Sequence, residues 1–203
     1  MVKDSRILAH FRRHDPTLFS LFQSIILDDL PVRQPRHYFV SLCREIIGQQ
    51  LSGRVADVIF DRFERLFPKR KVTPASIQKI SDENLRKTGM SWSKVRFIRA
   101  LSLHVHEKRV DLAALGNMTD EQVITTLTQV KGIGPWTAEM FLIFTLGRPD
   151  VFSYGDLGLR KAIQKLYKLR HAPTQKQMER IVKKWKPYRT YGARLLWKYL
   201  DLT

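Results

Sequence analysis

Cysteine is almost absent from this sequence, since Cys43 is the only one in 203 residues. A disulfide needs two thiols and an iron–sulfur cluster needs four thiolates, so neither can form within the chain. The six histidines are scattered and show no zinc-ligand spacing. Apolar residues such as Phe39, Leu42 and Ile46 surround Cys43, which predicts a buried, unreactive thiol.

Long apolar runs are also absent. No stretch approaches the roughly 18 uninterrupted apolar residues that a membrane-spanning helix needs. The first residues, MVKDSR, lead into mixed charge and lack the apolar centre of a signal peptide. We therefore expect no membrane partner and a cytoplasmic location.

Acidic residues are scarce relative to basic ones. The chain has 19 Asp and Glu against 36 Lys and Arg, which gives a net charge of +17. A folded domain with a pI near 10.3 is typical of nucleic-acid-binding proteins. Hydrophobic residues make up 43% of the chain, enough for a real core.

Strand-like alternation, internal repeats and low-complexity linkers are missing too. Apolar residues instead recur at helical spacing between short turns, so the fold class is predicted to be all-α. The expected longer helices cover approximately 16–26, 38–48, 55–66, 95–105, 174–185 and 191–202. Two shorter helices are expected to begin at Pro74 and Asp82, and capping boxes at Thr119–Gln122 and Thr174–Gln177 are expected to begin two others.

The segment 127–139, LTQVKGIGPWTAE, places two glycines and a proline between two apolar helical runs. We expect Gly132 and Gly134 to end the first helix with positive φ values, and Pro135 to begin the second. Backbone N–H groups at that N-terminus could then bind a phosphate. An ordinary helix–turn–helix explains the spacing about equally well, because Gly-x-Gly alone is weak evidence.

A lone carboxylate, Asp156, follows twenty residues after Trp136 and shortly before a helix that begins near Leu159. A carboxylate in this position can simply cap the helix. It can also act on a reacting group, for instance by stabilising positive charge or activating a water molecule. Both interpretations remain open from the residues alone.

Several segments together resemble one protein family. The hairpin at 130–138 resembles the helix-hairpin-helix signature of the DNA glycosylase superfamily, and the Trp136–Asp156 spacing is similar to its loop and catalytic aspartate. Two segments resemble the alkylbase branch, the DNA-3-methyladenine glycosylase II family: IIGQQLS at 46–52 and WKPYRTY at 185–191, which runs on to Trp197. GMSWSK at 89–94 is a weaker match.

The resemblance implies one compact glycosylase unit over 1–203, with an all-α, two-lobed fold and the active site in the cleft between the lobes. Lobe one would comprise approximately 1–35 plus 172–203. Lobe two would comprise approximately 36–171 and contain the hairpin at 119–146.

The activity that the resemblance implies is excision of alkylated purines, such as 3-methyladenine and 7-methylguanine, from double-stranded DNA by a monomer. The damaged nucleotide must leave the base stack before its glycosidic bond is accessible. Asp156 would be the catalytic residue, because the departing base leaves cationic character on the sugar. The order of preference among alkylated, etheno and deaminated purines stays open.

The resemblance also assigns the contacts to DNA. Gly132, Gly134 and Lys131 would bind phosphates. A monovalent cation, Na⁺ or K⁺, would be held by the main-chain carbonyls of Thr128, Val130 and Ile133; no other cofactor is expected. The wedge filling the gap in the duplex would be Gln50, with Leu51 or Gln49 as neighbouring alternatives.

The damaged base would lie against residues of an aromatic pocket, namely Trp136, Met140, Tyr188 and Trp197. An indole face attracts a cationic base through a cation–π interaction. Glycosylases with lyase activity have a lysine where Trp136 stands, so no Schiff base and no lyase activity are expected. Two alternatives are a helix-hairpin-helix protein that binds DNA without chemistry and a glycosylase for other damaged bases.

Overall fold

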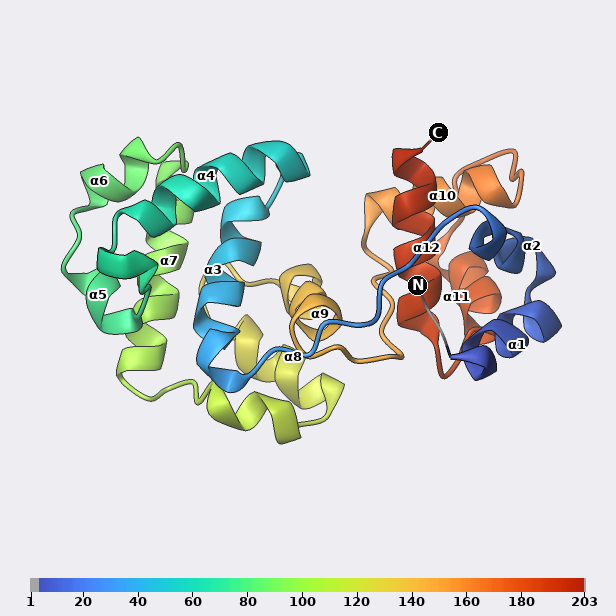
Figure 1. The fold of residues 1–203 in the computed structure, drawn as a ribbon, viewed down its shortest axis with the longest axis horizontal. Coiled ribbons are helices and arrows are strands. Elements are labelled where there is room, and N and C mark those ends of the chain that lie inside the picture. The colour runs from blue at the N-terminus through green and yellow to red at the C-terminus, as the bar shows by residue number, and fades with distance from the viewer. Residues whose placement is uncertain (1–3, 203) are drawn as a thin grey trace. The chain divides into compact units, whose positions relative to one another are not determined.

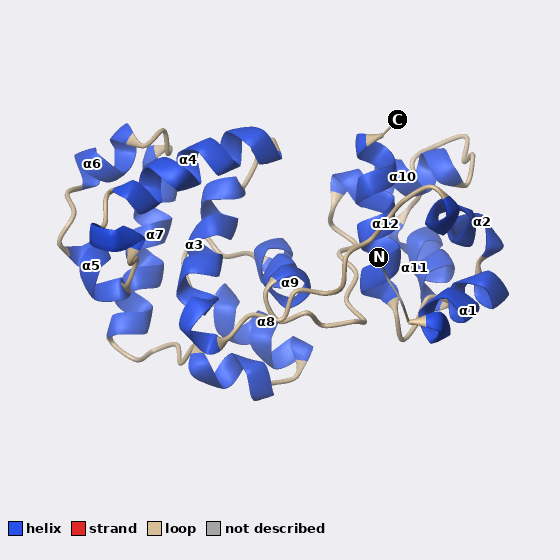
Figure 2. Ribbon diagram, viewed as in Figure 1, coloured by secondary structure: helices blue, strands red, loops and turns tan. Residues whose placement is uncertain are grey.

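The computed structural model describes residues 4–202, which fall into two compact units. The first unit combines the two ends of the chain, Met1–Pro31 and Gly147–Thr203, and the second comprises Val32–Leu146. The described residues form helices joined by loops and contain no strand, as Figure 2 shows. The all-α prediction is therefore confirmed for this part of the chain.

The second unit is built around α3 (Tyr38–Gly48), which packs against α4 (Gly53–Arg65), α7 (Trp92–His106) and α9 (Pro135–Phe144) (Figure 1). Its remaining elements are η2 (Pro35–His37), η3 (Pro68–Arg70), α5 (Pro74–Gln78), α6 (Asp82–Lys87), η4 (Ala113–Asn117) and α8 (Asp120–Thr128). Cys43 is fully buried in α3, and this burial raises the pKa of its thiol. The predicted burial of Cys43 is confirmed.

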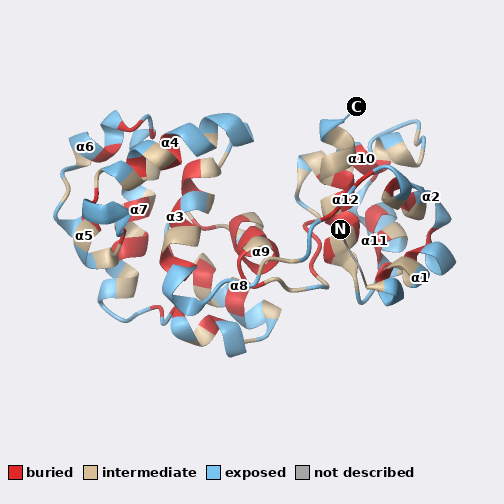
Figure 3. Ribbon diagram, viewed as in Figure 1, coloured by how far each residue is buried: buried red, intermediate tan, exposed pale blue. Residues whose placement is uncertain are grey.

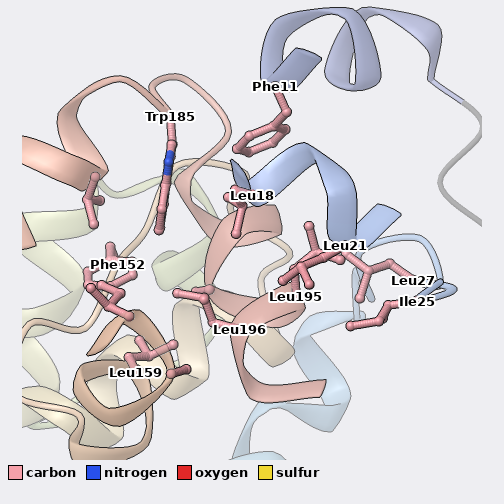
Figure 4. Packing of buried hydrophobic residues seen from close by; sticks show 14 of the residues in the cluster. Phe11, Leu18, Leu21, Ile25, Leu27, Phe152, Leu159, Trp185, Leu195 and Leu196 are labelled. Atoms are coloured by element: carbon pink, nitrogen blue, oxygen red, sulfur yellow. The ribbon is translucent and has the colours of Figure 1, made fainter. Parts of the chain in front are cut away.

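The first unit joins α1 (Ser5–His14), α2 (Pro16–Phe19) and η1 (Ser20–Gln23) to three later helices, α10 (Leu157–Leu166), α11 (Gln175–Lys183) and α12 (Arg189–Asp201). Figure 4 shows the apolar core that the two ends of the chain share. Its labelled side chains include Phe11 and Leu18 from the beginning of the chain, and Trp185 and Leu196 from the end.

A buried carboxylate also ties the two ends together. Asp15 accepts hydrogen bonds from Trp185 Nε1 at 2.7 Å and from the Tyr167 hydroxyl, and it pairs with Lys184 Nζ at 3.1 Å. Burial pushes the pKa of Asp15 up, but the hydrogen bonds from Trp185, Tyr167 and the Leu18 N–H outweigh it, so the pKa lies below its usual value. Trp185 of the WKPYRTY segment therefore anchors the first unit.

The division between the units corrects the predicted lobe boundaries. Residues 147–171 belong with the chain ends, whereas they were predicted to belong with the hairpin. The physical reason is that Leu159, Ala162 and Ile163 of α10 are buried in the first unit's core, where α10 packs against α12. The N-terminal boundary falls after Pro31 rather than near residue 35.

The helix expected over 16–26 is another correction. Only α2 and the short η1 form there, and residues 24–34 contain no helix. Ile25 is buried while Ile26 is exposed, so these two apolar residues do not share a buried helical face. Helix α1, which was not predicted from the sequence, begins at Ser5 and is capped by Asp4.

The other helix predictions agree closely with the structure. The Tyr38–Gly48 helix has the predicted bounds, and capping boxes begin α8 at Thr119 and α11 at Thr174. Figure 3 shows buried and exposed positions alternating along the helices, as expected for amphipathic elements. Within residues 4–202 no helix has the length and apolar character needed to cross a membrane.

Candidate active site

The hairpin of the second unit lies between α8 and α9. Gly132 has a φ of +96°, and a Cβ there would lie 2.1 Å from Cγ of Phe97. This position therefore requires glycine both for its backbone conformation and for the close approach of the Phe97 ring. Gly134 differs, because its φ is −94° and a Cβ added there would meet no atom within 4 Å. The prediction of positive φ is thus right for Gly132 and wrong for Gly134.

The hairpin also presents unused donors. Helix α9 begins after Gly134, which has no side chain to cap it, and Pro135 occupies its first turn. Within residues 4–202, no acceptor pairs with the backbone N–H of Lys131, Gly132 or Gly134. Open N–H groups at a helix N-terminus attract anions, and Lys131 is exposed beside them.

The hairpin carbonyls can be tested as cation ligands. Thr128 is the last residue of α8, where main-chain carbonyls lack helical partners and carry partial negative charge. The carbonyl of Val130 accepts the Ile133 N–H at 3.0 Å and retains a second lone pair. Such neutral oxygen donors fit a monovalent cation. Among residues 4–202, no group of three or more His, Cys, Asp or Glu could hold a metal.

The turn after α3 is fastened to this hairpin. Gln49 Nε2 donates to the Gly132 carbonyl at 2.8 Å and to Thr137 Oγ1 at 3.0 Å. Lys94 at the start of α7 donates from Nζ to the Ile47 carbonyl at 2.8 Å, which satisfies an open acceptor at the end of α3. Neither contact was predicted from the sequence, although both residues lie in segments that carry the family resemblance.

Gln50 and Leu51 follow on the exposed side of this turn. Gln50 has a φ of +57°, a left-handed conformation that is unusual for a residue other than glycine. Such backbone strain is often found at functional positions. Of the three residues predicted to fill a gap in DNA, Gln49 has its amide engaged with the hairpin, whereas Gln50 and Leu51 are presented to solvent.

The predicted pocket residues of α9 differ in burial. Trp136 is in the first turn and half-buried, while Met140, one turn later, is 3% exposed and lies within the core. Part of the Trp136 side chain is therefore accessible to solvent. Met140 packs as a core residue.

Asp156, in the first unit, is the N-cap of α10. Its Oδ1 accepts the backbone N–H of Leu159 at 2.8 Å and Trp197 Nε1 at 3.2 Å. A Cβ on Gly158 would lie 3.1 Å from that same oxygen, so glycine leaves room for the carboxylate. The structure thus confirms the capping interpretation and shows that an indole also fixes the carboxylate, which does not exclude chemistry at Asp156.

The loop that leads to Asp156 is clamped by the start of α12. Arg189 Nε donates to Asp150 Oδ1 at 2.7 Å, and Nη2 donates to Oδ2 at 3.1 Å. The buried Thr190 hydroxyl donates to the Arg148 carbonyl at 2.6 Å and accepts the Val151 N–H at 2.9 Å. Burial opposes the charge of Arg189, yet the Asp150 carboxylate raises its pKa.

These contacts give a role to Arg189 and Thr190 of the WKPYRTY segment, to which the sequence alone assigned no individual role. Bidentate guanidinium–carboxylate pairs fix geometry as well as charge.

The other two predicted pocket residues, Tyr188 and Trp197, lie in or beside α12. Trp197 contacts Asp156, whereas the ring of Tyr188 packs edge-on against His10 with 5.2 Å between ring centroids.

Comparisons with known proteins bear on both units. The family described as "HhH-GPD superfamily base excision DNA repair protein" matches residues 43–187. The chain is 32% identical over 162 residues to YfjP of Bacillus subtilis; this match covers 77% of the chain and 56% of that relative's length.

Two solved structures are similar over nearly the whole chain. The DNA-3-methyladenine glycosidase of Bacillus halodurans has a TM-score of 0.81 and 36% identity, covering 98% of this chain and 91% of its own. The 3-methyladenine DNA glycosylase Mag1 of Schizosaccharomyces pombe, solved in complex with abasic DNA, has a TM-score of 0.83 and 27% identity, covering 98% of both chains.

Proposed function

The chain belongs to the HhH-GPD superfamily of base excision DNA repair proteins and to its alkylbase glycosylase family, and we propose that it removes alkylated purines from DNA. The base would be flipped out of the duplex and its N-glycosidic bond hydrolysed, leaving an abasic site. Support comes from the relatives named above, from the open hairpin donors and from the net charge of +17.

The observation that carries the proposal is the fixed carboxylate of Asp156. Hydrogen bonds from Leu159 and Trp197 hold its Oδ1, and the preceding loop is clamped through Arg189. A preorganised carboxylate stabilises cationic character at the sugar without the cost of reorienting during the reaction. The same group can orient or deprotonate the attacking water.

The second unit would supply binding. Phosphate oxygens would accept hydrogen bonds from the N–H groups of Gly132 and Gly134, and Lys131 would add charge. The carbonyls of Thr128, Val130 and Ile133 would hold a Na⁺ or K⁺ ion, which would supply positive charge for phosphate binding. Gln50 and Leu51 would fill the gap left by the flipped nucleotide.

Recognition of the base would rely chiefly on the aromatic face of Trp136, while Trp197 would position Asp156. A base alkylated at N3 of adenine or N7 of guanine is cationic, so the indole attracts it by roughly 0.5–2 kcal/mol. The same charge makes it a better leaving group. Because Trp136 offers no amine, the proposed enzyme forms no Schiff base and has no lyase activity.

The test is single-turnover base release from methylated duplex DNA by wild type and Asp156→Asn. We expect release by wild type, a loss of about 10³-fold in the variant, and strand breaks only after alkali. Binding of DNA by both proteins without base release would instead favour a non-enzymatic helix-hairpin-helix protein. Strand cleavage without alkali would contradict the absence of lyase activity.

A further inference from the structure

Glu45 is a carboxyl group in α3 that neither the fold nor the proposed mechanism uses. Its side chain is half-buried, and it has no hydrogen-bond or ion-pair partner among residues 4–202. Burial raises the pKa of Glu45 to about 7, and the neighbouring Arg44 offsets only part of that rise. A carboxyl in this state costs folding free energy and is a poor structural element.

The position of Glu45 places it beside the proposed base-binding elements of the second unit. Gln49 is the C-cap of α3 and follows Glu45 by four residues, so the two residues lie on the same side of the helix, about one turn apart. Gln49 contacts Thr137 in the first turn of α9, and Trp136 precedes Thr137. Further back along this face, Tyr38 packs against Phe141 of α9 with ring centroids 5.4 Å apart.

The face of α3 that carries Glu45 is therefore the face turned towards α9. The contacts at its two ends, through Gln49 and Tyr38, bracket Glu45. The Glu45 carboxyl therefore lies on the same side of α3 as Gln49. The exposed Gln50 is the next residue after Gln49.

The surrounding charged groups leave this carboxyl without a salt bridge. Arg44 on α3 pairs with Asp57 of α4, and Lys94 of α7 donates to the Ile47 carbonyl. Glu139 is the single titratable side chain on α9. Arg36 of η2 donates to the neighbouring His37. Of these groups, Arg44 is the one whose charge acts on Glu45.

We propose that Glu45 is a general acid that protonates neutral damaged purines, such as hypoxanthine or 1,N⁶-ethenoadenine, as they depart. This inference rests on the proposed glycosylase function and extends it to a second substrate class. Cationic alkylated purines carry the positive charge that promotes their departure. Neutral purines do not, and they need a proton from a positioned acid to become good leaving groups.

The proposed step breaks the bond between C1′ and N9, and the electron pair of that bond stays with the base. The Glu45 carboxyl gives its proton to a ring nitrogen of the base, and the oxygen of a water molecule bonds to C1′. That water loses one proton to Asp156 or to solvent, and Glu45 recovers a proton from solvent after the product leaves.

The test compares Glu45→Gln with wild type on two duplex substrates, one with 7-methylguanine and one with hypoxanthine, in single-turnover assays from pH 5.5 to 9. We expect the variant to release hypoxanthine about 10²-fold more slowly and 7-methylguanine at nearly the wild-type rate. The second substrate serves as the folding control, because a misfolded variant would lose both activities.

The pH profile provides a readout that a structural role would not produce. An acid must be protonated to act, so release of hypoxanthine by wild type should fall as pH rises above about 7. Release by Glu45→Gln should lack this fall. Thermal unfolding at pH 8 should show the variant at least as stable as wild type, because a partly buried charge has been removed.

Contrary outcomes separate the two proposals. Equal release of hypoxanthine by both proteins, or release of 7-methylguanine with no release of hypoxanthine by wild type, would overturn the role of Glu45 and leave the glycosylase proposal intact. Absence of release from either substrate by wild type would overturn the glycosylase proposal and, with it, this inference.

Discussion

Two helix N-termini, one in each unit, use the same backbone physics in opposite ways. The N-cap of α9 is Gly134, which has no side chain to satisfy the first N–H groups of the helix. The N-cap of α10 is Asp156, whose carboxylate accepts the N–H of Leu159. The first terminus leaves its positive end for an external anion, whereas the second is already occupied by an anion of the protein itself.

The difference shows that the role of a helix N-terminus depends on the residues that pack around it. An uncapped N-terminus is useful here because Gln49 holds the preceding turn and Phe97 packs on Gly132. A capped N-terminus suits chemistry because Trp197 binds the same oxygen and fixes the carboxylate. Three pairs of variants test this comparison.

The largest effect is expected at Asp156, where capping and chemistry can be separated. Serine caps a helix about as well as aspartate but has no charge, whereas alanine provides neither a cap nor a charge. Both Asp156→Ser and Asp156→Ala should lose about 10³-fold in single-turnover base release. Urea unfolding should show that Ala alone lowers stability, by about 1 kcal/mol. Substantial activity in the serine variant would show that the cap, and not the charge, is what matters.

The next effect concerns the two glycines of the hairpin. Gly132→Ala forces a methyl group against Phe97 in a left-handed conformation and should lower the free energy of unfolding by about 2–4 kcal/mol. Gly134→Ala has the space and an ordinary φ, so its stability should stay near wild type. Its DNA affinity should fall about tenfold, because the methyl group hinders approach of a phosphate to the N–H groups.

Equilibrium binding to a short duplex and urea unfolding check both glycine variants. The double variant Gly132→Ala with Phe97→Ala should relieve the clash but retain the backbone strain. If Gly134→Ala bound DNA as tightly as wild type, the open N-terminus of α9 would not be a phosphate site.

The smallest effect is expected at the clamp of the Asp156 loop. Arg189→Lys keeps the charge but loses the bidentate geometry toward Asp150, so base release should slow by about tenfold. DNA affinity should not change, because Arg189 is engaged within its own unit. Arg180→Lys, an exposed arginine on α11, is the matched control and should behave as wild type. A loss of DNA binding in Arg189→Lys would contradict the clamp.

Helices with clear local signals were predicted well from the sequence. Thr119 and Gln122 form a capping box whose contacts span three residues, so neighbouring sequence suffices to identify it. The segment at 16–26 was predicted poorly because its apolar residues serve a shared core rather than a single helical face. Packing between the two ends of the chain determines which of these apolar residues are buried.

Some functional residues were likewise recognised from the sequence, whereas others depend on contacts between distant segments. Asp156 was recognised because the Trp136–Asp156 spacing resembles that of a known family, and Gly132 from the break between two helical runs. The amide of Gln49 illustrates the limit, because its partner at Gly132 is 83 residues away in the chain. Glu45 carried no sequence signal, since only burial without a partner makes its carboxyl unusual.

Composition and local order account for one set of properties. These are the excess positive charge, the lack of disulfides and iron–sulfur ligands, the helix caps and the glycine break, each of which depends on counts or on residues a few positions apart. Packing between residues far apart in the chain determined the boundary between the two units and the hydrogen-bond partners of the site residues. Trp197 reaches Asp156 over 41 positions and Arg189 reaches Asp150 over 39, because packing, which sums many weak contacts across the chain, brings them together.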